Sequence, residues 1–302
     1  MKVFLSGPAA GGKTSIARAV GQRAGLPVFA LRGSEQNYSL GTASRAPEHE
    51  KLLRWIEEEP RGVFDLGSQT VGCEETRRLV LDSGILVTLS ASMEVLLERS
   101  REEGLSSEVD PIEMEKALRD AIRKLSASYW ECHAEIDTTG LSAEAVAEEV
   151  LEVAELQPLL VPLGERSCRI EIGSGTRRRL QKHLKPYGKA SSPIVIVTDS
   201  GVEKSWGAEV REIASRSGHG VIFISFAEGE ASKQLRTVER IWHLALDGEV
   251  DRSSMVIAVG GGVVGDLAGF VAATLLRGVA FAQVPTTLLA MVDSSIGGKT
   301  GF

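Results

Sequence analysis

Two glycine-rich stretches carry the residue types best suited to binding phosphate groups. The first, GPAAGGKT at residues 7–14, follows the apolar run KVFLSG and precedes the helical pattern TSIARAVGQRAG. Its glycines allow backbone N–H groups to converge on phosphate oxygens at a helix N-terminus; they are Gly7, Gly11 and Gly12. Lys13 is expected to reach the β- and γ-phosphates, and the Thr14 hydroxyl to bind Mg²⁺. The spacing predicts an ATP–Mg²⁺ site, with a glycine-rich turn that binds no nucleotide as the alternative.

The second stretch, VIAVGGGVVGDLAGF, places a glycine triplet at residues 260–262 between an apolar run and a helical pattern. Gly261 and Gly262 allow the backbone to approach a pyrophosphate closely, although three glycines can equally serve only to make a turn. Four residues on, Asp266 can cap helical N–H groups or accept a hydrogen bond from a ribose or an amide. Thr286 and Thr287, directly after a proline, either form a turn or bind a ligand.

Polar groups are dense in the last residues of the chain, DSSIGGKTGF. Asp293, two serines and Lys299 surround a pair of glycines there. Burial of this much polarity without a ligand would be unfavourable. The density of the cluster therefore predicts a binding site.

The elements that must position these residues follow an α/β pattern. Apolar runs such as KVFLSG, GVFDLG and GILVTLSA alternate with amphipathic helical stretches over residues 1–155. Such alternation predicts parallel β-α-β units in which helices cover both faces of a sheet. Prolines and a glycine interrupt the pattern at 156–167, which we interpret as a linker, and a second α/β pattern occupies 168–302.

Composition narrows the class of protein. The chain has 302 residues, 43% hydrophobic and 25% charged, with a net charge of -7. This acidity argues against general nucleic-acid binding, and no apolar run is long enough to span a membrane. The three scattered cysteines and the absence of a signal-peptide pattern predict a cytoplasmic protein with reduced thiols. The five histidines show no metal-ligand spacing.

Residues 1–155 resemble shikimate kinase, a small P-loop enzyme that phosphorylates a cyclic polyol carboxylate. The resemblance rests on the phosphate loop, on the order of elements, on RAPE at 45–48 as the family's R-x-x-E, and on SYWECHAEIDTTGLSAEAVAEEV. It implies that Arg45 binds the carboxylate of a shikimate-like substrate, a task suited to a bidentate guanidinium.

The first domain departs from that family where the chemistry is done. The family's D-x-D, which serves metal and substrate, is replaced by Ala30, Leu31 and Arg32. Its G-G-G becomes GSQ at 67–69, its lid motif R-P-L is missing from REEGLSSEVDP, and an expected arginine is Leu125. Asp65 either replaces a lost metal ligand or bonds locally. Loss of these groups predicts a degenerate kinase that binds nucleotide, with an active kinase as the alternative.

Residues 160–302 closely resemble 3-dehydroquinate synthase. The glycine triplet, Arg277-Gly278, PTTLL at 285–289 and DSSIGGKTG at 293–301 fall in family order and spacing, and GEASK at 229–233 matches the family's G-E-x-x-K. Asp199 matches the first residue of D-x-N, with Gly201 in place of the asparagine. The resemblance implies that the following residues contact NAD: Asp199, Glu230, Lys233, Gly261, Gly262, Asp266, Thr286 and Thr287.

The resemblance also implies that Asp293 and Lys299 bind the substrate, and that Arg277 reaches the substrate phosphate across a homodimer interface. The implied reaction is NAD- and zinc-dependent conversion of 3-deoxy-arabino-heptulosonate 7-phosphate to 3-dehydroquinate with release of phosphate. The metal, zinc or another divalent ion, would be bound by a C-terminal helical domain that follows the GGKTG loop in the family and is absent from these 302 residues.

We therefore interpret the chain as the truncated N-terminal part of a bifunctional lyase of the shikimate pathway of aromatic amino-acid biosynthesis. We expect this part alone to be inactive as a synthase. The alternative is another sugar-phosphate cyclase or a polyol dehydrogenase, with the P-loop domain as a non-catalytic nucleotide-binding module.

Overall fold

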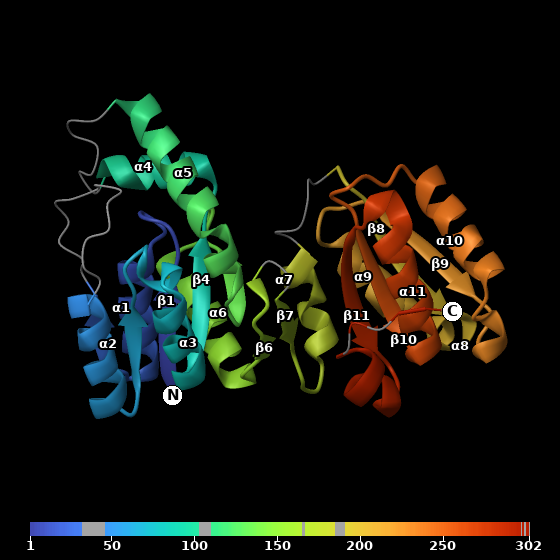
Figure 1. The fold of residues 1–302 in the computed structure, drawn as a ribbon, viewed down its shortest axis with the longest axis horizontal. Helices are drawn as coiled ribbons and strands as arrows, with labels where there is room; N and C mark the ends of the chain where they lie inside the picture. Colours follow the sequence, from blue (N-terminus) through green and yellow to red (C-terminus); the bar gives the residue numbers. More distant parts are fainter. Residues whose placement is uncertain are drawn as a thin grey trace. The chain divides into compact units, whose positions relative to one another are not determined.

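The computed structural model describes residues 1–31, 46–102, 110–164, 167–184, 191–296, 298, 300 and 301, with only the backbone described at 46–48. The chain divides into two compact units, Met1–Gly173 and Ser174–Phe302. Both are built from parallel strands and helices (Figure 1). Each unit is described below by itself.

The first unit alternates strands and helices along the chain. Its strands are β1 (Lys2–Ser6), β2 (Val28–Ala30), β3 (Gly62–Asp65), β4 (Ile85–Ser90), β5 (Ala134–Asp137), β6 (Leu159–Val161) and β7 (Cys168–Ile170). Its helices are α1 (Lys13–Ala24), α2 (Ala46–Glu58), α3 (Glu74–Ser83), α4 (Met93–Glu102), α5 (Pro111–Trp130) and α6 (Ala143–Leu156), with a 3₁₀ turn at Thr70–Gly72.

Five of these strands form one parallel sheet in the order β2-β3-β1-β4-β5. Alternate residues of β1 face opposite ways: Val3 and Leu5 pack with α1 and α6, and Phe4 packs with α2, α3 and α5. Because both faces are covered, the strands are apolar at successive positions and not at every second one. The predicted doubly covered α/β sheet is confirmed.

The short strands β6 and β7 pair antiparallel and belong to the first unit. Arg169 on β7 donates from Nε to the Cys132 carbonyl at 2.9 Å and from Nη2 to the Trp130 carbonyl at 3.0 Å. The backbone N–H of Gly164 donates to Glu131 Oε1 at 2.6 Å. These bonds tie residues 159–170 to the first unit, so the division after Gly173 falls later than the linker predicted at 156–167.

The second unit repeats the alternation. Its strands are β8 (Ile194–Asp199), β9 (Val221–Phe226), β10 (Met255–Gly260) and β11 (Ala280–Pro285). Its helices are α7 (Leu180–Leu184), α8 (Ser200–Val202), α9 (Ala208–Ser215), α10 (Leu235–Asp247) and α11 (Gly262–Thr274). Shorter 3₁₀ or π turns lie at Thr176–Arg179, Glu203–Gly207, Glu230–Ser232, Leu275–Arg277 and Ala290–Ser294.

Its four strands are parallel, in the order β11-β10-β8-β9. One face packs on α10 and α11 through a cluster that includes Val197 and Ala258, and the other packs on α7 and α9 through one that includes Ile196 and Ile257. The second α/β sheet predicted from the sequence is confirmed.

The longest helix of the first unit, α5, is not among the helices that the sequence pattern predicts. Asp110 caps its N-terminus by accepting the Ile112 N–H at 2.7 Å, and Pro111 occupies its first turn. This cap and proline are an ordinary start signal. Within the described part of the chain, the structure contains no helix long and apolar enough to cross a membrane.

Candidate functional site

The phosphate loop of the first unit connects the carboxyl end of β1 to α1. Gly7 has φ +136° and Gly12 has φ +83°, and even Ala10 is left-handed at φ +59°. These values curl the backbone over the N-terminus of α1. A Cβ atom at Gly7 would collide with the Leu89 carbonyl oxygen of β4, so glycine is required there by both conformation and space.

The two reactive side chains of the loop have partners in the structure. Lys13 Nζ donates to the carbonyl oxygens of Gly7 at 3.1 Å and Pro8 at 2.8 Å. Thr14 Oγ1 donates to Asp65 Oδ2 at 2.6 Å, at the end of β3. The lysine thus lies across the inside of the loop, where phosphate oxygens would replace carbonyl oxygens as its partners.

Arg99 is a site residue that the sequence analysis missed. From α4, its guanidinium donates to Thr138 Oγ1 at 2.9 Å and to the Thr138 carbonyl at 3.2 Å. A Cβ atom placed on Gly12 would lie 3.6 Å from Arg99 Nη1, so the arginine borders the phosphate loop. No local pattern signals this role, because Gly12, Arg99 and Thr138 come from three separate parts of the chain.

The positions where the first domain departs from shikimate kinase contain apolar or structural groups. Ala30 ends β2, and Leu31 is buried in the core. The Tyr129 hydroxyl donates to the Ser68 carbonyl at 2.6 Å and so holds the turn that replaces the family's G-G-G. Arg45, predicted to bind a carboxylate, lies outside the described residues, as do Arg32 and residues 103–109 of the lid region.

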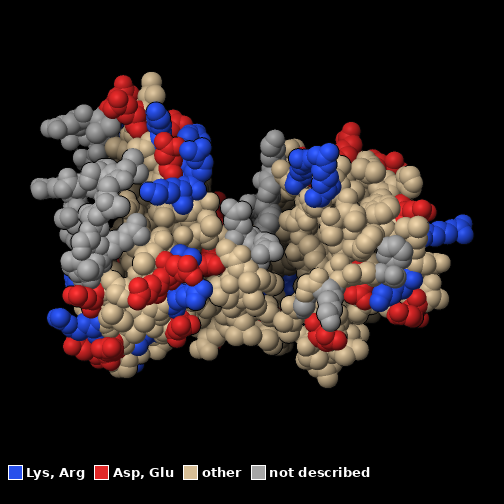
Figure 2. Space-filling model, viewed as in Figure 1, with Lys and Arg blue, Asp and Glu red and all other residues tan. Residues whose placement is uncertain are grey.

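The visible surface of the first unit carries interspersed acidic and basic side chains (Figure 2). Opposite charges are paired on the helices, for example Arg78 with Glu74 at 2.7 Å and Arg119 with Glu115 at 2.6 Å. This arrangement fits anion binding by local groups in the loop and not by a broad positive field.

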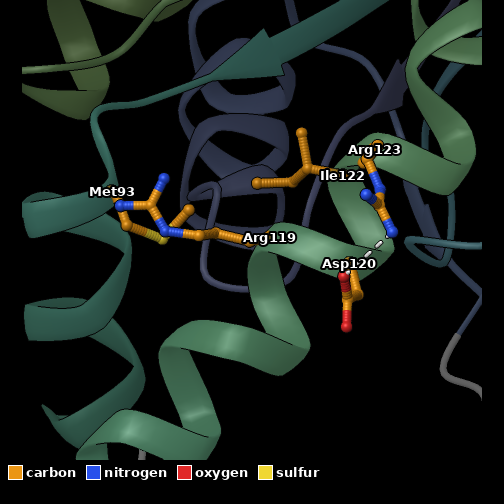
Figure 3. Close-up of a pocket in the computed structure, with 5 residues that line it drawn as sticks. All are labelled: Met93, Arg119, Asp120, Ile122 and Arg123. Carbon is orange, nitrogen blue, oxygen red and sulfur yellow. Dashed lines mark hydrogen bonds and ion pairs between the residues drawn. The ribbon is translucent and has the colours of Figure 1, made fainter.

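A hollow of about 450 Å³ lies between α4 and α5, lined by Met93, Arg119, Asp120, Ile122 and Arg123 (Figure 3). Arg123 pairs with Asp120 at 3.4 Å on the same helix. Met93 and Ile122 pack on an apolar cluster that also contacts Ala9 of the phosphate loop. The hollow and the phosphate loop thus pack on the same cluster, and the two arginines of the hollow are already paired with acidic residues of α5.

In the second unit, the predicted site residues meet at the carboxyl edge of the parallel sheet. Asp199 ends β8, the glycine triplet begins with the last residue of β10, and Thr286 and Thr287 follow β11. The chain runs from β8 outward to β9 and then crosses back to β10 on the other side of β8. Such a reversal of strand order is the usual place of the ligand site in open α/β sheets. Here it falls between β8, which ends at Asp199, and β10, which ends at Gly260.

Three glycines allow the last residues to lie close to α11. A Cβ atom on Gly261 would lie 3.3 Å from Thr287 Cγ2, and one on Gly262 would lie 3.7 Å from Ser294 Oγ. A Cβ atom on Gly269 would collide with the methyl group of Thr300. The Thr287 hydroxyl accepts the Ala290 N–H at 3.2 Å, so in this structure it caps the turn that follows.

Lys233 and Asp266, both predicted to contact NAD, form an ion pair. Lys233 Nζ lies 2.7 Å from Asp266 Oδ2 and 3.9 Å from Glu230 Oε1. The hydrogen bond with Asp266, supported by the charges of both carboxylates, raises the pKa of Lys233. Asp266 therefore binds a lysine 33 residues distant and not the helix N–H groups that were one alternative.

Asp199 uses its carboxylate locally. Its Oδ1 accepts the N–H groups of Gly201 at 2.9 Å and Val202 at 2.8 Å. A Cβ atom at Gly201, where the resembled family has asparagine, would collide with the carboxylate of Glu228. Glu228 thus fills the space of the missing side chain, a role that the sequence analysis did not identify.

The remaining predicted residues are not brought to this edge as a group. Arg277 comes between α11 and β11, at the amino end of the strand whose carboxyl end carries Thr286. Asp293 is exposed. Lys299 lies outside the described residues. The assignments of all three to substrate or phosphate binding stay predictions.

The second unit contains the clearest similarity to known proteins. Residues 223–302 match the family model described as 3-dehydroquinate synthase N-terminal. A curated protein from Thermosynechococcus vestitus named 3-dehydroquinate synthase is 47% identical over 143 residues, which cover 47% of this chain and 39% of that protein. The chain spans about two fifths of the length of the curated relatives it matches.

Two solved structures show weaker similarity. 2-Deoxy-scyllo-inosose synthase is 28% identical with a TM-score of 0.42, over 45% of this chain and 38% of that one. Shikimate kinase from Acinetobacter baumannii is 22% identical with a TM-score of 0.43, over 50% of this chain and 91% of that one. Because both TM-scores are below 0.5, we base no inference on either of them.

Proposed function

We propose that the second unit is the dinucleotide-binding part of a 3-dehydroquinate synthase in a bifunctional protein of aromatic amino-acid biosynthesis. The reaction is conversion of 3-deoxy-arabino-heptulosonate 7-phosphate to 3-dehydroquinate with release of phosphate. The observation that carries the proposal is the 47% identity over 143 residues to a relative of that name. The family-model match over residues 223–302 includes the glycine triplet, the Lys233–Asp266 pair and Thr287.

The residues present fit NAD. No side chain projects from the turn between β10 and α11, so a pyrophosphate can approach the N-terminus of that helix. Lys233 supplies a positive charge near this turn, held by Asp266. Bound NAD would supply a reversible hydride acceptor, which makes loss of phosphate from a neighbouring carbon possible.

The second unit's other residues have proposed roles in binding and orienting the substrate. Asp293 and Lys299 bind the hydroxyls and the phosphate group of the substrate. Arg277 binds the phosphate group of the substrate held by the second subunit of a homodimer. Among the described residues, no group of three or more His, Cys, Asp and Glu side chains could hold a metal ion. We therefore derive no step through zinc from these residues.

The synthase proposal is tested by phosphate release from the heptulosonate phosphate in the native protein, supplied with NAD and a divalent metal. Asp293→Asn and Lys299→Ala are each expected to abolish turnover while NAD still binds. Asp247→Asn, which changes an exposed carboxylate at the end of α10, is the matched control. Turnover at the wild-type rate in either site variant would refute that residue's assignment. Turnover only with another sugar phosphate or polyol would favour the alternative cyclase or dehydrogenase.

For the first unit we propose nucleotide binding without shikimate phosphorylation. The support is the sequence at positions 30 and 32, where Ala30 and Arg32 stand in place of the two carboxylates that a kinase of the resembled type needs. The test is shikimate-dependent consumption of ATP by the native protein. Binding of ATP without turnover is expected. Turnover at an ordinary kinase rate, about 1–100 per second, would instead show an active shikimate kinase, with Arg45 as its carboxylate ligand.

A further inference from the structure

A buried carboxylate faces the phosphate loop from the neighbouring strand. Asp65 ends β3, and only 6% of its surface is exposed. Its Oδ2 accepts the hydroxyl proton of Thr14 at 2.6 Å. Among the described residues, Thr14 is the one hydrogen-bond or ion-pair partner of the Asp65 side chain.

A single hydroxyl is weak compensation for a buried negative charge. Removing a carboxylate from water is costly unless a positive charge or several hydrogen-bond donors replace the water. The Thr14 hydroxyl is neutral and supplies one donor. The site as described is therefore electrostatically suited to a cation placed beside the Asp65 and Thr14 oxygens.

The position of the two residues defines which cation fits. Thr14 is the second residue of α1, directly after Lys13, so its hydroxyl lies at the end of the helix that phosphate groups approach. Magnesium prefers oxygen ligands and binds through one or two carboxylates together with substrate phosphates, keeping several waters. A hydroxyl and a carboxylate oxygen 2.6 Å apart, next to the phosphate loop, are such a partial ligand set.

The neighbouring strand shows why Asp65 is the carboxylate available. In the parallel pairing of β2 with β3, Ala30 lies directly opposite Asp65. Paired residues of adjacent strands place their side chains on the same face of the sheet. At this level of the sheet, β2 therefore presents a methyl group, and β3 presents the acid.

We propose that Asp65 and Thr14 together bind the divalent cation that accompanies a nucleoside di- or triphosphate in the first unit. This inference rests on the proposed nucleotide binding at the phosphate loop. It adds Asp65 as the residue through which nucleotide binding depends on a cation. Asp65 contributes a carboxylate oxygen, Thr14 its hydroxyl oxygen, and phosphate oxygens and water complete the coordination.

The competing role for the pair is structural, a hydrogen bond that ties β3 to α1. Asp65→Asn separates the two roles, because asparagine keeps the shape and an acceptor oxygen but loses the negative charge. A purely structural tie predicts unchanged cation affinity in this variant. A cation ligand predicts a large loss.

The experiment measures Mn²⁺ binding by electron paramagnetic resonance on the full chain in the presence of saturating ADP, with ADP binding measured separately in EDTA. Asp65→Asn is expected to weaken Mn²⁺ by about tenfold or more, since even outer-shell partners of metal ligands are worth 10–100-fold. Asp82→Asn, an exposed carboxylate on α3 in the same unit, is expected to bind Mn²⁺ like the wild type.

A second pair of variants applies if Asp65→Asn does not fold. Thr14→Val removes the hydroxyl at constant shape and is expected to weaken the binding of Mn²⁺. Thr14→Ser keeps the hydroxyl and is expected to keep the wild-type affinity for Mn²⁺. Wild-type Mn²⁺ affinity in Asp65→Asn, or equal affinity in the two Thr14 variants, overturns the inference while nucleotide binding stands. Failure of the wild type to bind ADP under either condition overturns the proposed nucleotide site itself.

Discussion

The two glycine loops of this chain use the same strand–turn–helix element in different ways. The loop before α1 is curved through left-handed residues, Ala10 at φ +59° and Gly12 at φ +83°. The turn before α11 has no left-handed residue, and Gly261 is extended at φ -80° and ψ -168°. The first loop can wrap around a phosphate group, whereas the second is a short turn kept open by the lack of side chains.

The loops also differ in what surrounds them. Beside the first, the ends of β2 and β3 present Ala30 and Asp65, so one carboxylate remains. Beside the second, Lys233, Asp266 and Thr287 all lie at or near the carboxyl edge of the sheet. The conformation of each loop and the side chains that surround it thus depend on different residues of the chain.

The largest expected effect distinguishes the two kinds of loop. Gly7→Ala forces a Cβ atom into the Leu89 carbonyl at a left-handed φ and is expected to destabilise the protein by about 3 kcal/mol. Gly261→Ala has an ordinary φ and is expected to stay within about 1 kcal/mol of the wild type while it weakens NAD binding. Urea denaturation measures both free energies of unfolding.

The control for the glycine comparison is Gly25→Ala. Gly25 is left-handed at φ +61°, and no atom lies within 4 Å of the position that a Cβ atom would take there, so only the backbone strain of about 1 kcal/mol applies. Equal unfolding midpoints for Gly7→Ala and Gly25→Ala would contradict the collision argument.

A smaller effect is expected at the charged pair of the second unit. Lys233→Met removes the partner of Asp266. It is expected to weaken the binding of NAD by about tenfold, which is the order of the loss of one hydrogen bond to a charged group. ADP binding at the loop before α1 should not change. Isothermal titration of both nucleotides measures this, with Lys182→Met on α7 as the control. Parallel loss of both affinities would mean that the variant disturbs the whole chain.

The smallest expected effect is a difference in how the two units respond to pH. Burial lowers the pKa of His133, whose Nδ1 accepts the Leu86 N–H at 3.0 Å, below its ordinary 6.5. The unfolded state then binds the proton more readily than the folded state. The contribution of His133 to the free energy of unfolding is therefore present above pH 6.5 and is lost as the pH falls below that value. The hydrogen bond with Asp266 raises the pKa of Lys233 above 10.5, so its contribution is present below pH 10.5 and is lost as the pH rises further.

Denaturation midpoints of the wild type and His133→Gln between pH 7.5 and 5 test the acid side, about one pH unit or more on either side of an ordinary histidine pKa. The wild type is expected to lose stability more steeply than the variant as the pH falls, because only the wild type has the buried His133. Carboxylates titrate in both proteins, so their effect cancels in the comparison. Identical slopes would mean that His133 is as easily protonated in the folded protein as in the unfolded one.

Much of the architecture followed from local pattern. Apolar runs at successive positions predicted strands covered on both faces, and Val3, Phe4 and Leu5 are indeed divided between two clusters. Gly25 ends α1 in the left-handed conformation, as its place after a helical pattern predicts. Glycine spacing located both loops, since the conformations that only glycine tolerates are a property of neighbouring residues.

Contacts between distant residues were decided by the tertiary structure. Thr14 and Asp65 are 51 residues apart, and Lys233 and Asp266 are 33 apart. Strand order places each pair together, and that order results from how the crossover helices pack, which no short pattern contains. The same packing puts Arg277 at the amino end of β11 and brings Arg99 to Thr138. The sequence alone indicated which residue types are suited to binding phosphate, and the fold determined which of those residues meet, because side-chain chemistry is local and strand order is not.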